Sequence, residues 1–186
     1  MTIPRSILAP GTLGDLDLRC VEGAVPPGLT GEVFISASDV GTAGAHAFFG
    51  DGMMVRLSLA PGTHGAPADR WAWRARMVDT PSVRLRAARP DAFGASWMGT
   101  MSPFGYANAA NTAPLPWGDR LFATWDAGRP VEVDPVTLGF LGEVGHRDDW
   151  APTMDLPVLP MVNSTAHPVI DPERDCLWTV SFNPMM

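Results

Sequence analysis

The stretch VEVDPVTLGFLG, residues 131–142, contains an apolar run, an Asp-Pro pair and a second apolar run. Proline fixes its own φ, and an aspartate side chain accepts hydrogen bonds from the backbone that follows it, so Asp134-Pro135 predicts a tight turn between two strands. The stretch PVIDPERDCLWTV, residues 168–180, repeats this arrangement around Asp171-Pro172. The two aspartates are 37 residues apart, close to the roughly 40–45 residues of one β-propeller blade. The spacing favours a repeated sheet unit.

Apolar and polar side chains alternate in two stretches of the first half of the chain. Residues 54–59 read MVRLSL and residues 70–78 read RWAWRARMV. Because successive side chains of a strand point to opposite faces, both stretches are predicted to be strands with one buried face. We expect Val55 and Leu57 on the buried face and Arg56 on the solvated face.

Further strands are expected at residues 119–126, DRLFATWD, and 176–182, CLWTVSF, which are rich in aromatic and β-favouring residues. In FFGDGMM, the glycines of residues 50–52 predict a tight turn, because glycine readily adopts positive φ. Helical periodicity is nearly absent, and 19 Gly and 19 Pro are scattered between the apolar runs. These features predict an all-β fold of many short strands, either a propeller or a sandwich.

The composition is that of one globular domain spanning residues 1–186, with 46% hydrophobic and 18% charged residues. The net charge of −7 argues against nucleic acid as a partner, since binding to phosphates needs a basic face. The arginines from Arg70 to Arg89 alternate with apolar residues and are expected on the solvated side of strands. Residues 145–161 have three prolines and no clean alternation, so we expect a long connection there.

Cysteine usage and the N-terminus predict a soluble, cytoplasmic protein. Cys20 and Cys176 are far apart in the chain and are expected to be two reduced thiols. The first residues lack the apolar core of a signal peptide, and no segment approaches the roughly 20 apolar residues of a membrane span.

The chain has four histidines, His46, His64, His146 and His167. None has a second histidine two to five residues away, so there is no local metal motif, and a metal site would have to be assembled from separate strands. We expect His64 and His146 in exposed loops and His46 in a structural role.

His167 directly precedes Pro168, which cannot donate to a sheet ladder, so an edge strand is expected there. In a propeller the innermost strand of each blade is an edge beside the central channel, where histidines of several blades can meet. The residues alone leave open whether His167 is a ligand or an ordinary strand histidine. They contain no nucleophile elbow, phosphate loop or dinucleotide fingerprint, and no catalytic residue is assigned.

Four stretches in register resemble the carotenoid cleavage oxygenases, which include apocarotenoid and lignostilbene dioxygenases. They are PPGLTGEVF at 26–34, HAFFGDGMMVRLSL at 46–59, residues 110–142, and TAHPVIDPERDCLW at 165–178. The resemblance implies a seven-bladed β-propeller with a non-haem Fe(2+) held by four histidines, three of them supported by carboxylates. Thr-Ala-His-Pro is the first ligand motif of the family, so it implies His167 as a metal ligand, while His46 matches a structural segment.

The resemblance further implies a dioxygenase that uses O₂ to cleave an alkene double bond of a carotenoid, apocarotenoid or stilbenoid. Seven blades of about 40 residues need about 280 residues, so we expect the first blades of an incomplete propeller. The other three ligands are then expected beyond Met186, on C-terminal blades, and the chain alone is expected to be inactive. The apolar residues of the connection are expected to pack on the domain; the alternative is that those from Asp149 to Met161 form a substrate tunnel mouth or a peripheral membrane contact.

Two alternatives stay open. The chain could be a non-catalytic β-sheet scaffold that kept the fold without the metal ligands. It could also be part of a lactonase-type propeller hydrolase using Ca²⁺ or Zn²⁺, for which Asn111 and Asn163 are candidate ligands.

Overall fold

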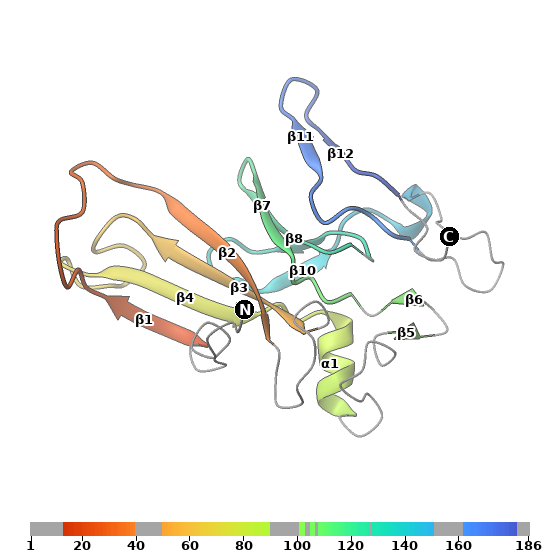
Figure 1. Ribbon diagram of the computed structural model, residues 1–186, viewed down its shortest axis with the longest axis horizontal. Helices are drawn as coiled ribbons and strands as arrows, with labels where there is room; N and C mark the ends of the chain where they lie inside the picture. Colours follow the sequence, from red (N-terminus) through yellow and green to blue (C-terminus); the bar gives the residue numbers. More distant parts are fainter. Residues whose placement is uncertain are drawn as a thin grey trace, which may run out of the picture.

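A computed structural model describes residues 13–39, 50–89, 101–102, 105–106, 108–126, 128–150 and 162–181 of the chain. Strands dominate these residues, which confirms the all-β prediction (Figure 1). The strands are β1 (Gly14–Leu18), β2 (Glu32–Asp39), β3 (Asp51–Ser58), β4 (Trp71–Met77), β5 (Met101–Ser102), β6 (Gly105–Tyr106), β7 (Ala113–Trp117), β8 (Arg120–Thr124), β9 (Val131–Val133), β10 (Phe140–Glu143), β11 (Val169–Asp171) and β12 (Cys176–Trp178). The helices are α1 (Pro81–Ala88) and a 3₁₀ helix (Arg147–Asp149).

The strands form two four-stranded antiparallel sheets and two two-stranded sheets. The first sheet has the order β1-β4-β3-β2 and the second sheet the order β10-β9-β8-β7. The short strands β5 and β6 pair with each other, and β11 and β12 form a further hairpin, called the third hairpin because it follows the two sheets along the chain. The two sheets lie side by side, with β2 against β7 and the third hairpin beyond the second sheet (Figure 1). The first sheet, the second sheet and the third hairpin therefore follow one another both along the chain and in space.

The Asp-Pro repeat is confirmed as a repeated turn. Asp134 follows β9, and its Oδ1 accepts the N–H groups of Val136 and Thr137 at 2.9 and 2.6 Å. The N–H of Thr137 is also the main reason why the pKa of the Asp134 carboxyl lies below its usual range. Asp171 ends β11, and its Oδ1 accepts the N–H groups of the second and third residues after it, both at 3.1 Å. Both aspartates thus accept two backbone N–H groups of their own turn in the same way.

The core lies between the first and second sheets. Its fully buried members are Met54, Val78, Ala110, Leu121, Ala123, Val131, Val133 and Leu138, with Phe34 and Phe140 packed against them. The prediction for β3 is confirmed for Val55, which is 3% exposed, and wrong for Arg56, because the second sheet packs against the side of the strand that carries Met54 and Arg56. Met54 and Arg56 are 0% and 1% exposed, whereas Leu57 on the predicted face is only partly buried.

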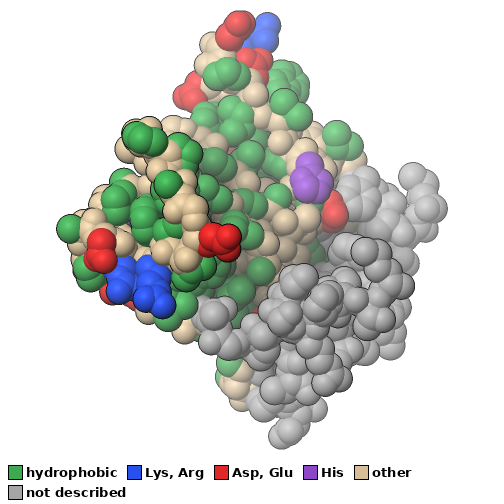
Figure 2. Space-filling model, turned by 60° about the vertical axis from the view of Figure 1, so that its left-hand side comes forward, with side chains coloured by type: hydrophobic (Ala, Val, Ile, Leu, Met, Phe, Trp, Pro, Cys, Tyr) green, Lys and Arg blue, Asp and Glu red, His purple; other side chains and the backbone are tan. Residues whose placement is uncertain are grey.

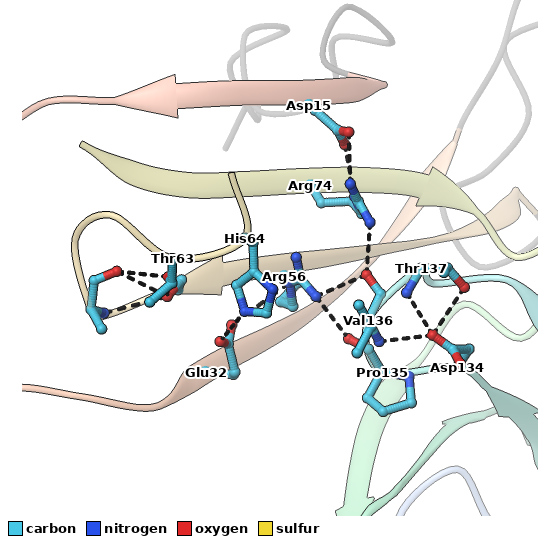
Figure 3. Close-up of polar contacts among 12 residues, drawn as sticks. Asp15, Glu32, Arg56, Thr63, His64, Arg74, Asp134, Pro135, Val136 and Thr137 are labelled. Atoms are coloured by element: carbon cyan, nitrogen blue, oxygen red, sulfur yellow. Dashed lines mark hydrogen bonds and ion pairs between the residues drawn. The ribbon is translucent and has the colours of Figure 1, made fainter. Parts of the chain in front are cut away.

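Arg56 is therefore not a solvated arginine but a buried cation between the sheets (Figure 3). Its Nη1 donates to the carbonyls of Val136 and Pro135 at 2.8 and 3.3 Å, and its Nε lies 3.7 Å from Oε2 of Glu32. Arg74, opposite Arg56 on β4, donates to the same Val136 carbonyl at 2.9 Å. Two arginines of the first sheet thus bind the Asp-Pro turn of the second sheet.

Asp15 holds Arg74 in place. The two carboxylate oxygens of Asp15 accept from Nε and Nη2 of Arg74, each at 2.8 Å, and Oδ1 also accepts from Arg76 at 2.9 Å. The hydrogen bonds from Arg74 are the main reason why the pKa of the Asp15 carboxyl is below its usual range. The alternation predicted that Arg74 and Arg76 are solvated. Both are instead paired with the carboxylate of Asp15.

The predicted tight turn at residues 50–52 is also wrong. Gly50 and Gly52 do not have positive φ, and Gly52 lies inside β3. Its N–H donates to the carbonyl of Ala109 at 2.7 Å, and a Cβ on Gly52 would lie 2.1 Å from the carbonyl oxygen of Ala110. Glycine is required here because another backbone passes too close for a side chain.

Helix α1 is a structural element that the periodicity did not predict. Thr80 caps it, because its Oγ1 accepts the N–H of Val83 at 3.3 Å, and Pro81 occupies the first helical position. A threonine followed by proline is a recognised helix start, so this signal was present in the sequence. The hydroxyl of Thr80 also reaches the carbonyl of Asn108 at 3.1 Å, which ties the helix to the start of the second sheet.

The face of the first sheet that turns away from the core keeps apolar side chains exposed. Leu16, Val33 and Ile35 are 45%, 37% and 44% exposed, and Val33 and Ile35 lie opposite apolar residues of β3. Figure 2 shows a face of the molecule on which hydrophobic side chains make up much of the described surface.

Two further expectations concern the thiols and the long connection. Cys20 and Cys176 are both free thiols, as predicted. Of the predicted connection at 145–161, residues 151–161 lie outside the described residues. Among the helices of the described ranges, none has the length and apolar character needed to cross a membrane.

Replacing the buried Arg56 by methionine should strongly destabilise the fold. The substitution removes the donor of the Pro135 carbonyl, one of two donors of the Val136 carbonyl and the ion pair with Glu32. We therefore expect a loss of about 2–4 kcal/mol in the free energy of unfolding. Arg174→Met is the control, because Arg174 is an exposed partner of Asp171 and should cost below about 0.5 kcal/mol. Urea unfolding monitored by tryptophan fluorescence measures both, and equal losses would contradict the role of Arg56.

Gly52→Ala should destabilise the chain by about 2–4 kcal/mol, because its new Cβ collides with backbone and not with a flexible side chain. Gly142→Ala is the matched control, since a Cβ at this strand position meets nothing within 4 Å. It should change the stability by less than about 1 kcal/mol. Thermal unfolding distinguishes the two variants, and a stable Gly52→Ala chain would refute the close approach.

Asp15→Asn should make the stability less sensitive to acid. Folding lowers the pKa of Asp15, so the unfolded chain binds more protons and this contribution is lost as the pH falls from about 5 towards 3. The variant should lose less stability than the wild type over that interval in urea unfolding series. Asp17→Asn, on the same strand, is the control, and an Asp15→Asn profile parallel to the wild type would disprove the linkage.

Candidate metal-binding site

Of the three described histidines, His64 and His146 have side-chain partners. Nε2 of His64 lies 2.8 Å from Oε1 of Glu32, and Nδ1 of His146 lies 3.3 Å from Oδ2 of Asp148. Both are in exposed loops, as predicted, and the His64 side chain is also paired with Glu32. His46 lies outside the described residues.

His167 differs from both, because its imidazole has no hydrogen bond or ion pair within the described part of the chain. It is exposed and lies in a bend two residues before β11. Among the described strands, β11 pairs only with β12, so it is an edge strand, as Pro168 predicted. Both ring nitrogens of His167 are therefore available to a ligand.

The backbone just before His167 is held by the second sheet. The N–H of Ala166 donates to Oδ1 of Asp126 at 2.7 Å, and the carbonyl of Ala166 accepts from Oγ1 of Thr124 at 2.5 Å. Ala166 and Thr124 are both 0% exposed. Both polar groups of Ala166 are thus bound by side chains from the end of β8.

The preceding residues are fixed as well. Oγ of Ser164 donates to the carbonyl of Gly128 at 2.7 Å, and the N–H of Thr165 donates to Oγ1 of Thr179 at 3.2 Å. Asn163 and Ser164 are 1% and 0% exposed. Asn163, Ser164 and Ala166 are therefore buried, Thr165 is partly buried, and the chain reaches the surface at His167.

Asn111 occupies the equivalent place in the second sheet, two residues before β7. It is buried, its Nδ2 donates to the carbonyl of Gly50 at 2.7 Å, and its Oδ1 accepts from the hydroxyl of Thr112 at 3.2 Å. Its amide thus binds the first sheet through Gly50 and its own neighbour Thr112. Asn163, the other candidate ligand of a lactonase-type site, is also buried.

The described residues supply one metal ligand and not a complete site. No three histidine, cysteine, aspartate or glutamate side chains of these residues come together in a way that could hold a metal ion. A neutral imidazole suits Fe²⁺, and the exposed ring of His167 fits one position on such an ion. The remaining positions would need ligands from outside the described ranges.

Thr124 and Asp126 are site residues that the sequence did not reveal. Residues 119–126 were predicted to be a strand, and period two puts both side chains on one face. The alternation could not show that this face meets Ala166, because that contact joins segments about 40 residues apart.

Comparison with known sequences identifies relatives over most of the chain. The family model described as retinal pigment epithelial membrane protein matches residues 10–185. The chain is 33% identical over 150 residues to carotenoid cleavage dioxygenase 7 of Oryza sativa, which covers 70% of this chain and 23% of that protein. It is 30% identical over 136 residues to apocarotenoid-15,15'-oxygenase of Synechocystis, which covers 66% of this chain and 26% of that protein.

Solved structures of carotenoid and stilbene oxygenases also resemble the fold of this chain. A variant of Synechocystis apocarotenoid oxygenase superposes with a TM-score of 0.69 at 26% identity, covering 95% of this chain and 38% of that one. Pseudomonas brassicacearum lignostilbene dioxygenase superposes with a TM-score of 0.63 at 23% identity, covering 91% and 34%, and shows the same fold. The predicted incomplete β-propeller is thereby confirmed, because the chain spans little more than a third of these propeller proteins. The match of the family model over residues 10–185 shows that the chain belongs to the family of retinal pigment epithelial membrane protein and the carotenoid cleavage oxygenases.

Proposed function

We propose that the whole protein is a non-haem Fe(2+) dioxygenase that cleaves an alkene double bond of a carotenoid, apocarotenoid or stilbenoid, and that His167 is one of its iron ligands. The observation that carries the proposal is the available imidazole of His167 on a fixed backbone. Two relatives support it, since they are named a carotenoid cleavage dioxygenase and an apocarotenoid oxygenase.

Fe(2+) held by neutral imidazoles keeps positions open and supplies the chemistry of O₂ at an apolar, conjugated substrate. The contribution of this chain is to hold a ligand at a defined place. His167 presents its ring at the end of an edge strand, and the buried segment before it prevents the backbone from shifting. A single imidazole binds Fe²⁺ only weakly, so the chain alone is expected to be inactive.

We propose further C-terminal blades as the partner that completes the propeller. The apolar face of the first sheet is one support. The third hairpin is the other, since Val169, Trp178 and Val180 are 65%, 60% and 65% exposed. Exposed apolar surface of this kind favours a covering partner.

We also propose a cytoplasmic enzyme that meets its lipophilic substrate and O₂ beside a membrane surface. The free thiols of Cys20 and Cys176 support the compartment. The segment predicted to make the membrane contact, residues 149–161, lies mostly outside the described residues.

Replacing His167 by alanine in the whole protein tests the proposed function. Loss of one ligand should lower the affinity for Fe²⁺ by at least about 10–100-fold, with loss of alkene cleavage. Iron bound after anaerobic loading and buffer exchange, measured by mass spectrometry, is the readout.

His146→Ala is the matched control, because His146 is exposed and pairs only with Asp148 in the described part of the chain. It should retain wild-type iron. If His167→Ala also retains it, His167 is not a ligand. A whole protein that binds no iron would favour a non-catalytic scaffold, and one that binds Ca²⁺ or Zn²⁺ would favour a hydrolase.

A further inference from the structure

The hydroxyl of Thr124 is buried between two backbone carbonyls. Its Oγ1 lies 2.5 Å from the carbonyl oxygen of Ala166 and 3.1 Å from that of Ala113, its partner across the β7–β8 ladder. A hydroxyl has one hydrogen to donate, and the shorter distance assigns it to Ala166. Thr124 is 0% exposed, so water does not replace this donor.

The Ala166 carbonyl belongs to the peptide unit that carries His167. The N–H of the same peptide unit, on His167, donates to Oγ1 of Thr165 at 3.2 Å. Both polar groups of this unit are therefore bound, the carbonyl by the second sheet and the N–H locally. The plane of the peptide fixes the direction in which the Cα–Cβ bond of His167 leaves the backbone.

We propose that Thr124 is a positioning residue for His167. The imidazole has no partner of its own among the described residues, so its place depends on the backbone that carries it. A metal ligand has to be held within roughly 0.5 Å of its productive position. The proposal deepens the proposed function and rests on it, since it assumes that His167 binds a metal ion.

Thr124 contributes in a way that Asp126 does not. Asp126 binds the N–H of Ala166, but it is exposed, so water can bind that N–H when the carboxylate is lost. The carbonyl of the buried Ala166 has no such substitute. Removing the Thr124 hydroxyl should therefore loosen the peptide unit of His167 directly.

Three variants of the whole protein separate positioning from general stability. Thr124→Val keeps the shape and removes the donor, and Thr124→Ser keeps the donor. Thr80→Val is the matched control, because Thr80 is also 0% exposed and donates to a backbone carbonyl, that of Asn108, far from His167 in the sequence. If Thr124→Val does not fold, Thr124→Cys takes its place as a similar-sized side chain with a weak donor.

The first readout is amide hydrogen exchange of residues 165–167, compared with that of β3 in the same sample. In Thr124→Val the amide exchange rate should rise about tenfold at residues 165–167 and stay unchanged in β3. In Thr124→Cys the exchange rate at residues 165–167 should rise to a smaller extent. Thr124→Ser and Thr80→Val should stay within about twofold of the wild type at residues 165–167. Unchanged exchange in Thr124→Val, or equal acceleration in Thr80→Val, overturns the proposal.

The second readout is the NMR shift of the His167 ring protons on adding Co²⁺, the metal of a cobalt-substituted Synechocystis relative. The shift depends on how the ring stands relative to the ion, which a merely structural role would not change. It should fall by about half or more in Thr124→Val and stay in Thr124→Ser and Thr80→Val. An unchanged shift in Thr124→Val overturns the proposal that Thr124 positions His167. No shift in the wild type overturns His167 as a ligand, while the exchange data still decide whether Thr124 fixes the peptide.

Discussion

The arrangement of the two sheets depends on the buried guanidinium of Arg56. A buried cation is costly unless its donors are satisfied, and here the acceptors are the Val136 and Pro135 carbonyls of the next sheet, with Glu32 nearby. Those carbonyls are available because Asp134 binds the N–H groups of its own turn and fixes the turn's shape. The Asp-Pro turn therefore determines where the second sheet can dock, and the apolar core fills the space that this docking defines.

At the opposite ends of the same strands, the sheets approach through their backbones. Gly52 meets Ala109 and Ala110 without a side chain between them, and the hydroxyl of Thr124 bridges directly to Ala166. Contacts this close leave no room for water, so each polar group must be matched to a partner on the next unit. The result is a rigid region of buried backbone from which His167 alone of the described histidines projects with an unpaired ring.

The sequence predicted repetition better than burial. The Asp-Pro turns and the strands around them could be predicted, because an Asp side chain and a proline act on neighbouring residues. The burial of Arg56 could not be predicted, since the second sheet covers the side of β3 that carries it, and no pattern within β3 shows where that sheet packs. Gly52 was mistaken for a turn residue because close approach depends on a segment more than 50 residues away. His167 was identified through a family resemblance and not through spacing, and Thr124 was not identified at all.

Asn111 and His167 show how one repeated backbone position takes on different roles. Both lie two residues before the first strand of their unit. At Asn111 the first sheet covers the position, and the amide is used to bind Gly50 and Thr112. At His167 no described residue forms a hydrogen bond or ion pair with the ring, while the backbone of the preceding residues is bound by the second sheet. Coordination needs both conditions at once, since a side chain whose polar atoms are already hydrogen-bonded has none left for a metal, and a loosely held one binds it weakly. The candidate ligand is therefore distinguished less by being a histidine than by standing where buried backbone ends and an open sheet edge begins.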